Sequence, residues 1–445
     1  MSNSLEERWP GPAVEERTAP LQEDAPARGP VKRFLLRFTF VYLLLYSLPF
    51  LLGVLLKPVG KAYESLWISF VPWIGKQAFQ LDIAVHETGS GDTAYDFMRL
   101  LCILVLAVVA GLAWTFLDRK RSNDARIDEW LRVCVRFSLA TAMIVYGAHK
   151  VFSAQFGTPG LDRLLTTFGN ASPMGLLWTF MGFSRVYTLF AGLAELVGGI
   201  LLVSRRTTLL GALISIGVLV NVVVLNFCYD VPVKQFSAHL LAMAVLLALP
   251  DLRRLANFLL FNRKVEPAEI RPLFQRARLN RAALVLRTVF IAGVSIYWLY
   301  SAYKIDVEMS GYASTTPFYG IWEVEEYAVN GQVRPPLITD ASRWRWLVFE
   351  YPGYLSVHTM RQERPHYYEF QLDSNRKRLV LINAKAKDPK SRSVLSYQQP
   401  GPELLTVAGA IDGQKITARL HRVDESKFQL FSRGFHWISE WPFNR

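Results

Sequence analysis

Long runs of apolar residues alternate with short polar segments over the first two thirds of the chain. Most of these runs have about 20 residues, the length that an α-helix needs to cross the ~30 Å hydrocarbon core of a bilayer. The pattern therefore predicts a bundle of about seven transmembrane helices. The predicted spans are residues 34–56, 98–117, 133–152, 186–204, 207–228, 236–249 and 283–303.

The parts of the chain outside these runs differ in composition and in their pattern of apolar residues. Residues 1–31 are polar and rich in Pro and Glu, which predicts a disordered tail because such a segment buries little apolar surface. Residues 32–303 form the predicted transmembrane domain. Near residue 318 short alternating runs begin, so we predict a separate β domain over residues 304–445.

The β domain shows about eight short runs separated by turn residues, such as Asn330-Gly331 and Pro352-Gly353. This spacing predicts an antiparallel β-barrel or sandwich. Gly320 and Trp322 resemble the GxW signature of lipocalins, in whose barrels a late arginine covers the tryptophan. The candidates for that arginine are Arg422 and Arg433. The sequence leaves open whether such a barrel is hollow for a ligand or filled as a docking domain.

The distribution of charged residues predicts the orientation of the chain in the membrane. The chain carries a formal charge of +13, and its Lys and Arg gather in alternate loops, for example at Arg205-Arg206 and Arg253-Arg254. By the positive-inside rule the tail 1–31 is cytoplasmic, and the β domain is periplasmic or extracellular. The expected surroundings are the lipid bilayer, and no nucleic-acid partner is predicted, because the basic residues follow the membrane topology.

The residues typical of metal and nucleophilic sites are sparse. Cys102, Cys134 and Cys228 lie in or beside apolar runs and form no CxxC or Cys/His ligand spacing, so no metal site is predicted. The histidines of the β domain, including His358, fall on separate predicted strands, and no catalytic motif occurs there.

Polar residues inside the spans are costly in a bilayer and therefore mark candidate sites. With the orientation above, most of them fall in the outer leaflet, which predicts one polar pocket there with Lys150 and Glu195 as its central pair. A plainer reading is that Lys150 reaches the headgroups and that the asparagines bind neighbouring helices. The pocket candidates are Tyr146, His149, Lys150, Glu195, Asn221, Asn226, Asp230, Lys234, His239, Asp92, Asp96 and Arg99.

Residues 132–255 resemble the DoxX-like family of bacterial four-helix membrane proteins. The resemblance rests on the sequence YGAHK at 146–150, on GLAELVGGILL at 192–202, and on the basic turn Arg205-Arg206-Thr207. It implies a four-helix core in the bacterial inner membrane and a link to membrane redox or thiol chemistry, because the family is associated with thiosulfate:quinone oxidoreductase. This chain adds further spans and the β domain to that pattern.

Two functions follow as hypotheses. The first is an accessory or redox-linked membrane component, which binds a quinone or lipid in the outer-leaflet pocket and docks a periplasmic or membrane partner protein through the β domain. The alternative is an integral membrane enzyme with Lys150, Glu195 or His149 as acid–base groups at the interface. A weaker likeness to the membrane part of vitamin K-dependent carboxylase-like proteins rests only on Lys150 and His149 at a helix end.

Overall fold

A computed structural model describes residues 29–444, apart from 87, 119–123, 268–273, 275, 362–363, 384–391 and 412. Nearly all of the predicted disordered tail, and the basic loop at 119–121, lie outside these residues. The first helix, α1, begins at Pro30, slightly before the predicted start of the transmembrane domain at residue 32.

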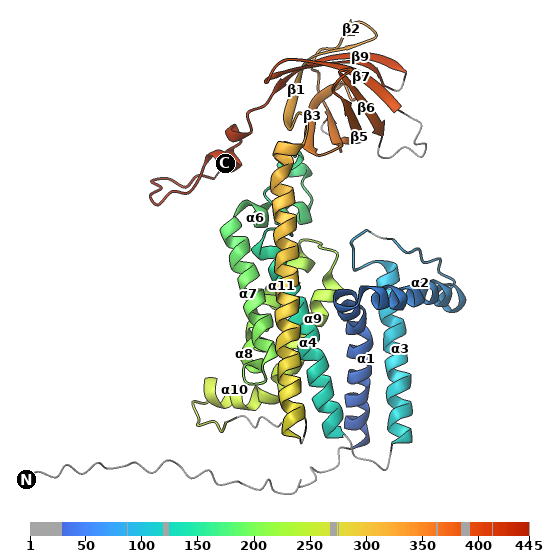
Figure 1. Ribbon diagram of the computed structural model, residues 1–445, viewed down its shortest axis with the longest axis vertical. Helices are drawn as coiled ribbons and strands as arrows, with labels where there is room; N and C mark the ends of the chain where they lie inside the picture. The colour runs from blue at the N-terminus through green and yellow to red at the C-terminus, as the bar shows by residue number, and fades with distance from the viewer. Residues whose placement is uncertain are drawn as a thin grey trace, which may run out of the picture.

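Both parts of the predicted fold class are confirmed. Within the described ranges, seven helices are long and apolar enough to cross a membrane. They stand side by side as a bundle below a β-barrel (Figure 1). We call the end of the bundle nearer the barrel its barrel end. The spanning helices are α1 (Pro30–Leu55), α3 (Ala94–Leu117), α4 (Asp124–Val151), α7 (Arg185–Val203), α8 (Thr208–Cys228), α9 (Lys234–Ala248), whose span continues to Leu259, and α11 (Ala277–Thr315).

Helices α4, α7, α8 and α9 contact one another in a ring and form the core of the bundle. Glycines allow the close approach. A Cβ on Gly199 of α7 would lie 3.0 Å from the carbonyl oxygen of Ala140 on α4, and one on Gly211 of α8 would lie 2.7 Å from the backbone nitrogen of Leu202. Small residues at these crossings let backbones pack directly, as is common between membrane helices. Helices α1 and α11 pack against α4 from outside.

Helix α2 (Lys57–Phe79) was not predicted. It lies across the barrel end of α1 and α3 (Figure 1), with Trp67 and Val71 buried and Leu66 and Trp73 exposed. Such an amphipathic helix is suited to the plane of a membrane interface. Its charged residues interrupt the apolar run, so a search for spans passes over it.

Helix α10 (Leu252–Leu259) lies across the opposite end of the bundle (Figure 1). It follows α9 through the short helix η2 (Leu249–Asp251). The candidate span that begins with α9 runs from Lys234 to Leu259 and therefore includes α10.

Helix α11 has 39 residues and continues well past the predicted end of the transmembrane domain at residue 303. Charged residues such as Lys304 and Asp306 ended the apolar run, but a helix that leaves the bilayer can carry charges. The β domain therefore begins at Gly320 and not at residue 304. At about 58 Å, α11 is roughly twice as long as the hydrocarbon core is thick, and it rises to the barrel.

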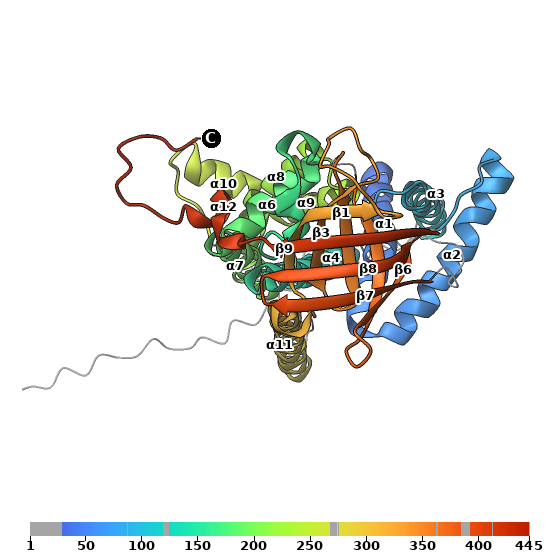
Figure 2. The same ribbon diagram turned by 90° about the horizontal axis from the view of Figure 1, so that it is seen from above.

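Eight antiparallel strands close the barrel in sequence order, because β1 pairs with β9 as well as with β3; a short β2 pairs with β1 alone. Figure 2 shows the barrel from above. The strands described are β1 (Gly320–Val329), β2 (Gln332–Val333), β3 (Trp344–Tyr351), β4 (Tyr354–Thr359), β5 (His366–Asp373), β6 (Arg378–Asn383), β7 (Arg392–Gly401), β8 (Leu404–Ile411) and β9 (Gln414–Arg422). The helices η3 (Glu425–Lys427) and α12 (Gln429–Ser432) follow.

The interior of the barrel is packed with apolar side chains from every strand of the closed sheet. Trp322 is 1% exposed in this core, and its partner in the register between β1 and β9 is Arg422. Arg433, the other candidate for covering Trp322, instead stacks on Phe443. The packed interior agrees with the filled alternative left open by the sequence.

The barrel rests on the membrane domain through the outer faces of β1 and β3. Ile321 and Val348 point out of the barrel and pack against Leu161 of α5 (Leu161–Leu165). This short helix belongs to the segment between α4 and α7, which also contains η1 (Phe168–Asn170) and α6 (Pro173–Phe183). The two domains are therefore joined by an apolar contact beside the residues described next.

Candidate functional site

The central pair predicted from the sequence is an ion pair between α4 and α7. Lys150 Nζ lies 2.7 Å from each carboxylate oxygen of Glu195, and the two residues are only 7% and 3% exposed. The ammonium also lies 5.8 Å from the centre of the Tyr146 ring. Gly192 makes room for this contact, since a Cβ there would lie 2.8 Å from Cβ of Lys150. The two charges neutralise each other where the bundle is most tightly packed.

The histidines and asparagines of the predicted pocket point in different directions. His149 packs against Trp298 of α11. His239 instead forms a hydrogen bond with the Tyr42 hydroxyl of α1 and stacks on Tyr46. Asn226 donates to Ser237 and ties α8 to α9, as the interhelical alternative predicted. Asn221 is exposed on the surface of α8.

The remaining predicted residues hold helix ends in place. The Asp92 carboxylate accepts the backbone N–H groups of Lys234 and Gln235 at the start of α9. Asp96 closes a capping box with Thr93 at the start of α3. The other two contacts are ion pairs, of Arg99 with Glu64 of α2 and of Lys234 with Asp230. The structure thus does not bring the twelve candidates into one pocket.

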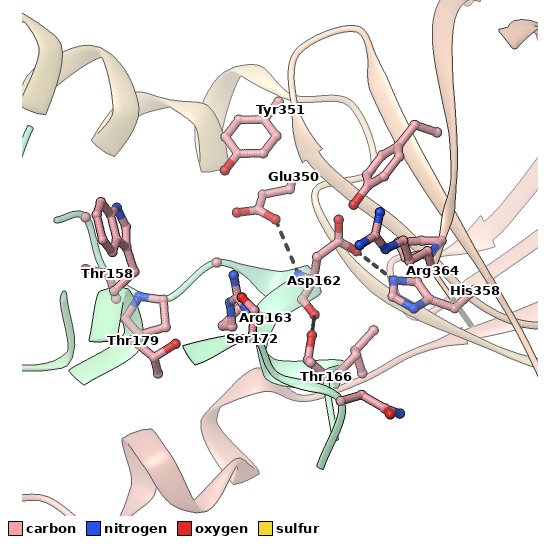
Figure 3. A pocket seen from close by; sticks show the side chains of 18 of the residues that line it. Thr158, Asp162, Arg163, Thr166, Ser172, Thr179, Glu350, Tyr351, His358 and Arg364 are labelled. Carbon is pink, nitrogen blue, oxygen red and sulfur yellow. Dashed lines mark hydrogen bonds and ion pairs between the residues drawn. The ribbon is translucent and has the colours of Figure 1, made fainter. Parts of the chain in front are cut away.

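A polar cavity of about 640 Å³ lies further out, between the α5–α6 segment and the outer wall of the barrel. Figure 3 shows it from close by. The lining comes from both domains, so the cavity exists only where they meet. Its polar side chains include Thr158, Asp162, Arg163, Thr166, Ser172, Thr179, Glu350, Tyr351, His358, Arg364 and Tyr367.

Asp162 of α5 links the two domains at this cavity. Its Oδ1 lies 2.7 Å from Nε2 of His358 on β4 and also accepts a hydrogen bond from the Ser356 hydroxyl. The same oxygen therefore has two partners on one barrel strand. A carboxylate bound to an imidazole in this way fixes the orientation of the ring, so His358 presents a defined face to the cavity.

Glu350, at the end of β3, is the second acid of the cavity. Its Oε2 accepts the backbone N–H of Asp162 at 3.4 Å, and Tyr351 lies beside it in the lining. Burial, and after it the nearby Asp162 carboxylate, raise the pKa of Glu350 above its ordinary value. A carboxyl group of this kind can hold a proton in a pH range where exposed glutamates have lost theirs.

The rest of the lining makes the cavity amphiphilic. Arg163 and Arg364 supply guanidinium donors, while Trp178, Met309 and Trp346 supply apolar surface. In the described part of the chain, no group of three or more His, Cys, Asp or Glu side chains is arranged to hold a metal ion. The chemistry that the cavity offers is hydrogen bonding, proton exchange and apolar contact with one molecule.

The raised pKa of Glu350 predicts a pH dependence. Between the unfolded pKa and the higher native pKa, the native state binds more protons than the unfolded state, so the free energy of unfolding falls as pH rises. We expect the Glu350→Gln variant to lose this decline and to gain stability relative to the wild type as pH rises from about 4.5. Thermal unfolding midpoints from pH 4 to 8 measure the difference, and parallel curves for the two proteins would contradict it.

Sequence reasoning missed this cavity because its two halves are far apart in the chain, Asp162 near the bundle and His358 almost 200 residues later. One signal was present. Trp344 to Phe349 in β3 is apolar at consecutive positions and does not alternate, except at Arg345, which indicates that both faces of the strand are covered. That pattern predicts a partner for the outer face, without naming α5.

Comparisons with known proteins find a likeness over part of the chain. The chain matches no family model, and no solved structure matches it. It is 34% identical over 143 residues to YwoB of Bacillus subtilis (strain 168), which is described as an uncharacterized protein. The match takes in 32% of this chain but 87% of YwoB. The chain therefore belongs to the family of YwoB.

Proposed function

We propose that this protein is an accessory membrane component that binds the polar end of an amphiphile, a quinone or a lipid, in the cavity between the bundle and the barrel. The observation that carries the proposal is the mixed lining of that cavity. Carboxyl, imidazole and guanidinium groups face it together with Trp178, Met309 and Trp346. An amphiphile leaving the bilayer beside α6 and α11 would meet both kinds of surface.

The distribution of basic residues supports a periplasmic location for this cavity. Lys32, Arg33, the turn Arg205-Arg206 and the helix α10 with Arg253 all belong to the end of the bundle opposite the barrel (Figure 1). Basic residues at that end favour a cytoplasmic N-terminus in the bacterial inner membrane, and a periplasmic barrel. The cavity would then open on the periplasmic side, next to the outer leaflet.

In this proposal the ion pair of Lys150 and Glu195 has a structural role, because it holds together the helices below the cavity. It lies close below the cavity, since α4 ends at Val151 and Gln155 already belongs to the lining. Because each charge needs the other in a low-dielectric environment, the pair fixes α7 against α4. The resemblance to DoxX-like proteins adds the redox association and makes a quinone the first ligand to test.

The barrel is better suited to docking than to carrying a ligand, because its interior is filled. The segment after α12 exposes large apolar side chains, with Phe435 78%, Trp437 92% and Trp441 83% exposed. Aromatic residues of this kind are enriched in protein interfaces. We assign this segment to a periplasmic or membrane partner protein.

The proposal predicts that filling the cavity removes the ligand. In Thr179→Trp, a large side chain enters the lining, and we expect at least a tenfold loss of copurified quinone or lipid that binds stoichiometrically. The matched control is Phe180→Trp, on the next residue of α6, which is 60% exposed and not part of the lining. Mass spectrometry of the organic extract from the detergent-purified protein gives the measurement. Equal ligand content in the two variants would contradict the proposal.

A second candidate function, acid–base catalysis, is favoured by one observation. Glu350 has a raised pKa and lies in the same cavity as the hydrogen-bonded pair of Asp162 and His358. The same extraction separates the two functions, because binding returns the ligand with its mass unchanged, whereas catalysis yields a product of different mass.

A further inference from the structure

Three arginines come together at the end of the bundle opposite the barrel. Arg136 of α4 lies one turn beyond Ala140, whose carbonyl oxygen faces Gly199 of α7. Arg205 follows the end of α7 at Val203, so it too lies beyond the contact between Gly199 and Ala140. Arg287 of α11 is placed there too, because the ring of Phe137 contacts that of Phe290 at 5.6 Å. Arg205 and Arg287 are accordingly the charged neighbours that act on Arg136.

Arg136 is a buried cation with an incomplete set of partners. It is only 7% exposed, and its Nε has no hydrogen-bond partner among the described residues. Its guanidinium lies 5.4 Å from the centre of the Phe137 ring, a contact that offsets part of a desolvation cost. Arg132, one turn before Arg136 in α4, is different because it forms an ion pair with Asp128. A buried guanidinium whose Nε has no partner among the described residues is stabilised by an anion.

The surroundings indicate where that anion comes from. Arg287 is partly exposed, and its neighbours Leu286 and Val289 are 71% and 63% exposed on the surface of α11. Helix α10 lies across this end of the bundle and exposes Leu252 and Phe258 (Figure 1). A helix of this kind is suited to the headgroup region of a bilayer, so this end of the bundle, with Arg287 partly exposed, would lie near the lipid headgroups.

We propose that Arg136, Arg205 and Arg287 form a binding site for the phosphate of an anionic phospholipid, whose acyl chains lie along α11. Guanidinium groups match phosphate oxygens in geometry and charge. Basic pockets between helices at this depth are suited to anionic headgroups. The lipid would supply the counter-charge that the described residues of the bundle do not give Arg136, and it would join α11 to the four-helix core.

The test compares thermal unfolding of the full chain in nanodiscs of phosphatidylethanolamine alone and with phosphatidylglycerol added. For the wild type we expect phosphatidylglycerol to raise the midpoint by about 3 °C or more. The variants Arg136→Gln and Arg287→Gln should each lose most of this shift. In phosphatidylethanolamine alone, Arg136→Gln should be at least as stable as the wild type, because it removes a buried charge that lacks a counter-ion there.

The matched control is Arg132→Gln, on the same helix and outside the site, which should keep the full shift. Arg287→Gln is a safeguard against misfolding of the other variant, since this side chain is partly exposed. A wild type that responds equally to both lipid compositions, variants that keep the shift, or an equal shift produced by inorganic phosphate would each overturn the proposal.

Discussion

Replacing Glu195 by alanine is expected to lower the free energy of unfolding by about 3–5 kcal/mol, because it leaves the ammonium of Lys150 buried without a partner. The two side chains are 9% and 5% exposed, so water cannot replace the lost carboxylate without opening the contact between α4 and α7. Lys150→Ala should have a similar effect for the converse reason. Thermal or denaturant unfolding of the protein in detergent measures both changes.

The double variant Lys150→Met/Glu195→Leu separates the pair from the individual charges. It removes both charges and keeps an apolar contact of similar size, so we expect its stability to lie within about 1 kcal/mol of the wild type or above it. Lys234→Ala is a control, since it breaks an exposed ion pair with Asp230 and should cost less than about 1 kcal/mol. If Glu195→Ala unfolds like the wild type, the pair does not hold α7 to α4.

Gly192→Leu is expected to be the second most damaging change, with a loss of about 3 kcal/mol or more. A Cβ at this position would lie 2.7 Å from the backbone nitrogen of Val151 and 2.8 Å from Cβ of Lys150. The helix backbone of α4 cannot yield as a flexible side chain would, so α7 must move away. That movement also lengthens the distance from Lys150 to Glu195.

The matched control is Gly217→Leu on α8. A Cβ at Gly217 meets nothing within 4 Å, so the larger side chain extends from the surface of the bundle. We expect Gly217→Leu to unfold within about 0.5 kcal/mol of the wild type. Similar losses for the two leucine variants would show that the cost comes from removing a glycine and not from the contact between α4 and α7.

The sequence predicted the parts of the structure that the bilayer constrains most strongly. A spanning helix needs a long apolar run, so all seven spans could be found. A carboxylate deep in such a run needs a partner, so Glu195 could be paired with Lys150 before any coordinates were known. The direction of the other polar side chains was not predictable, since Asn221 and Asn226 differ only in which face of α8 they occupy.

The parts that were missed depend on contacts between distant segments. Helix α2 lies across the barrel end of α1 and α3 and carries charged residues among its apolar ones, so its sequence lacks a long apolar run. The cavity needs Asp162 and His358 to meet across almost 200 residues of chain. Neither residue stands out in its own segment, and they come together only because the barrel docks on α5.

The length of α11 links the thickness of the bilayer to the shape of the cavity. This helix begins at the end of the bundle opposite the barrel, lines the cavity with Met309, and packs Tyr312 against Tyr351 with ring centres 5.5 Å apart. A rigid rod of about 58 Å acts as a lever, so one degree of tilt moves its far end by about 1 Å. A bilayer that changes the tilt of α11 would thereby widen or narrow the space beside Glu350.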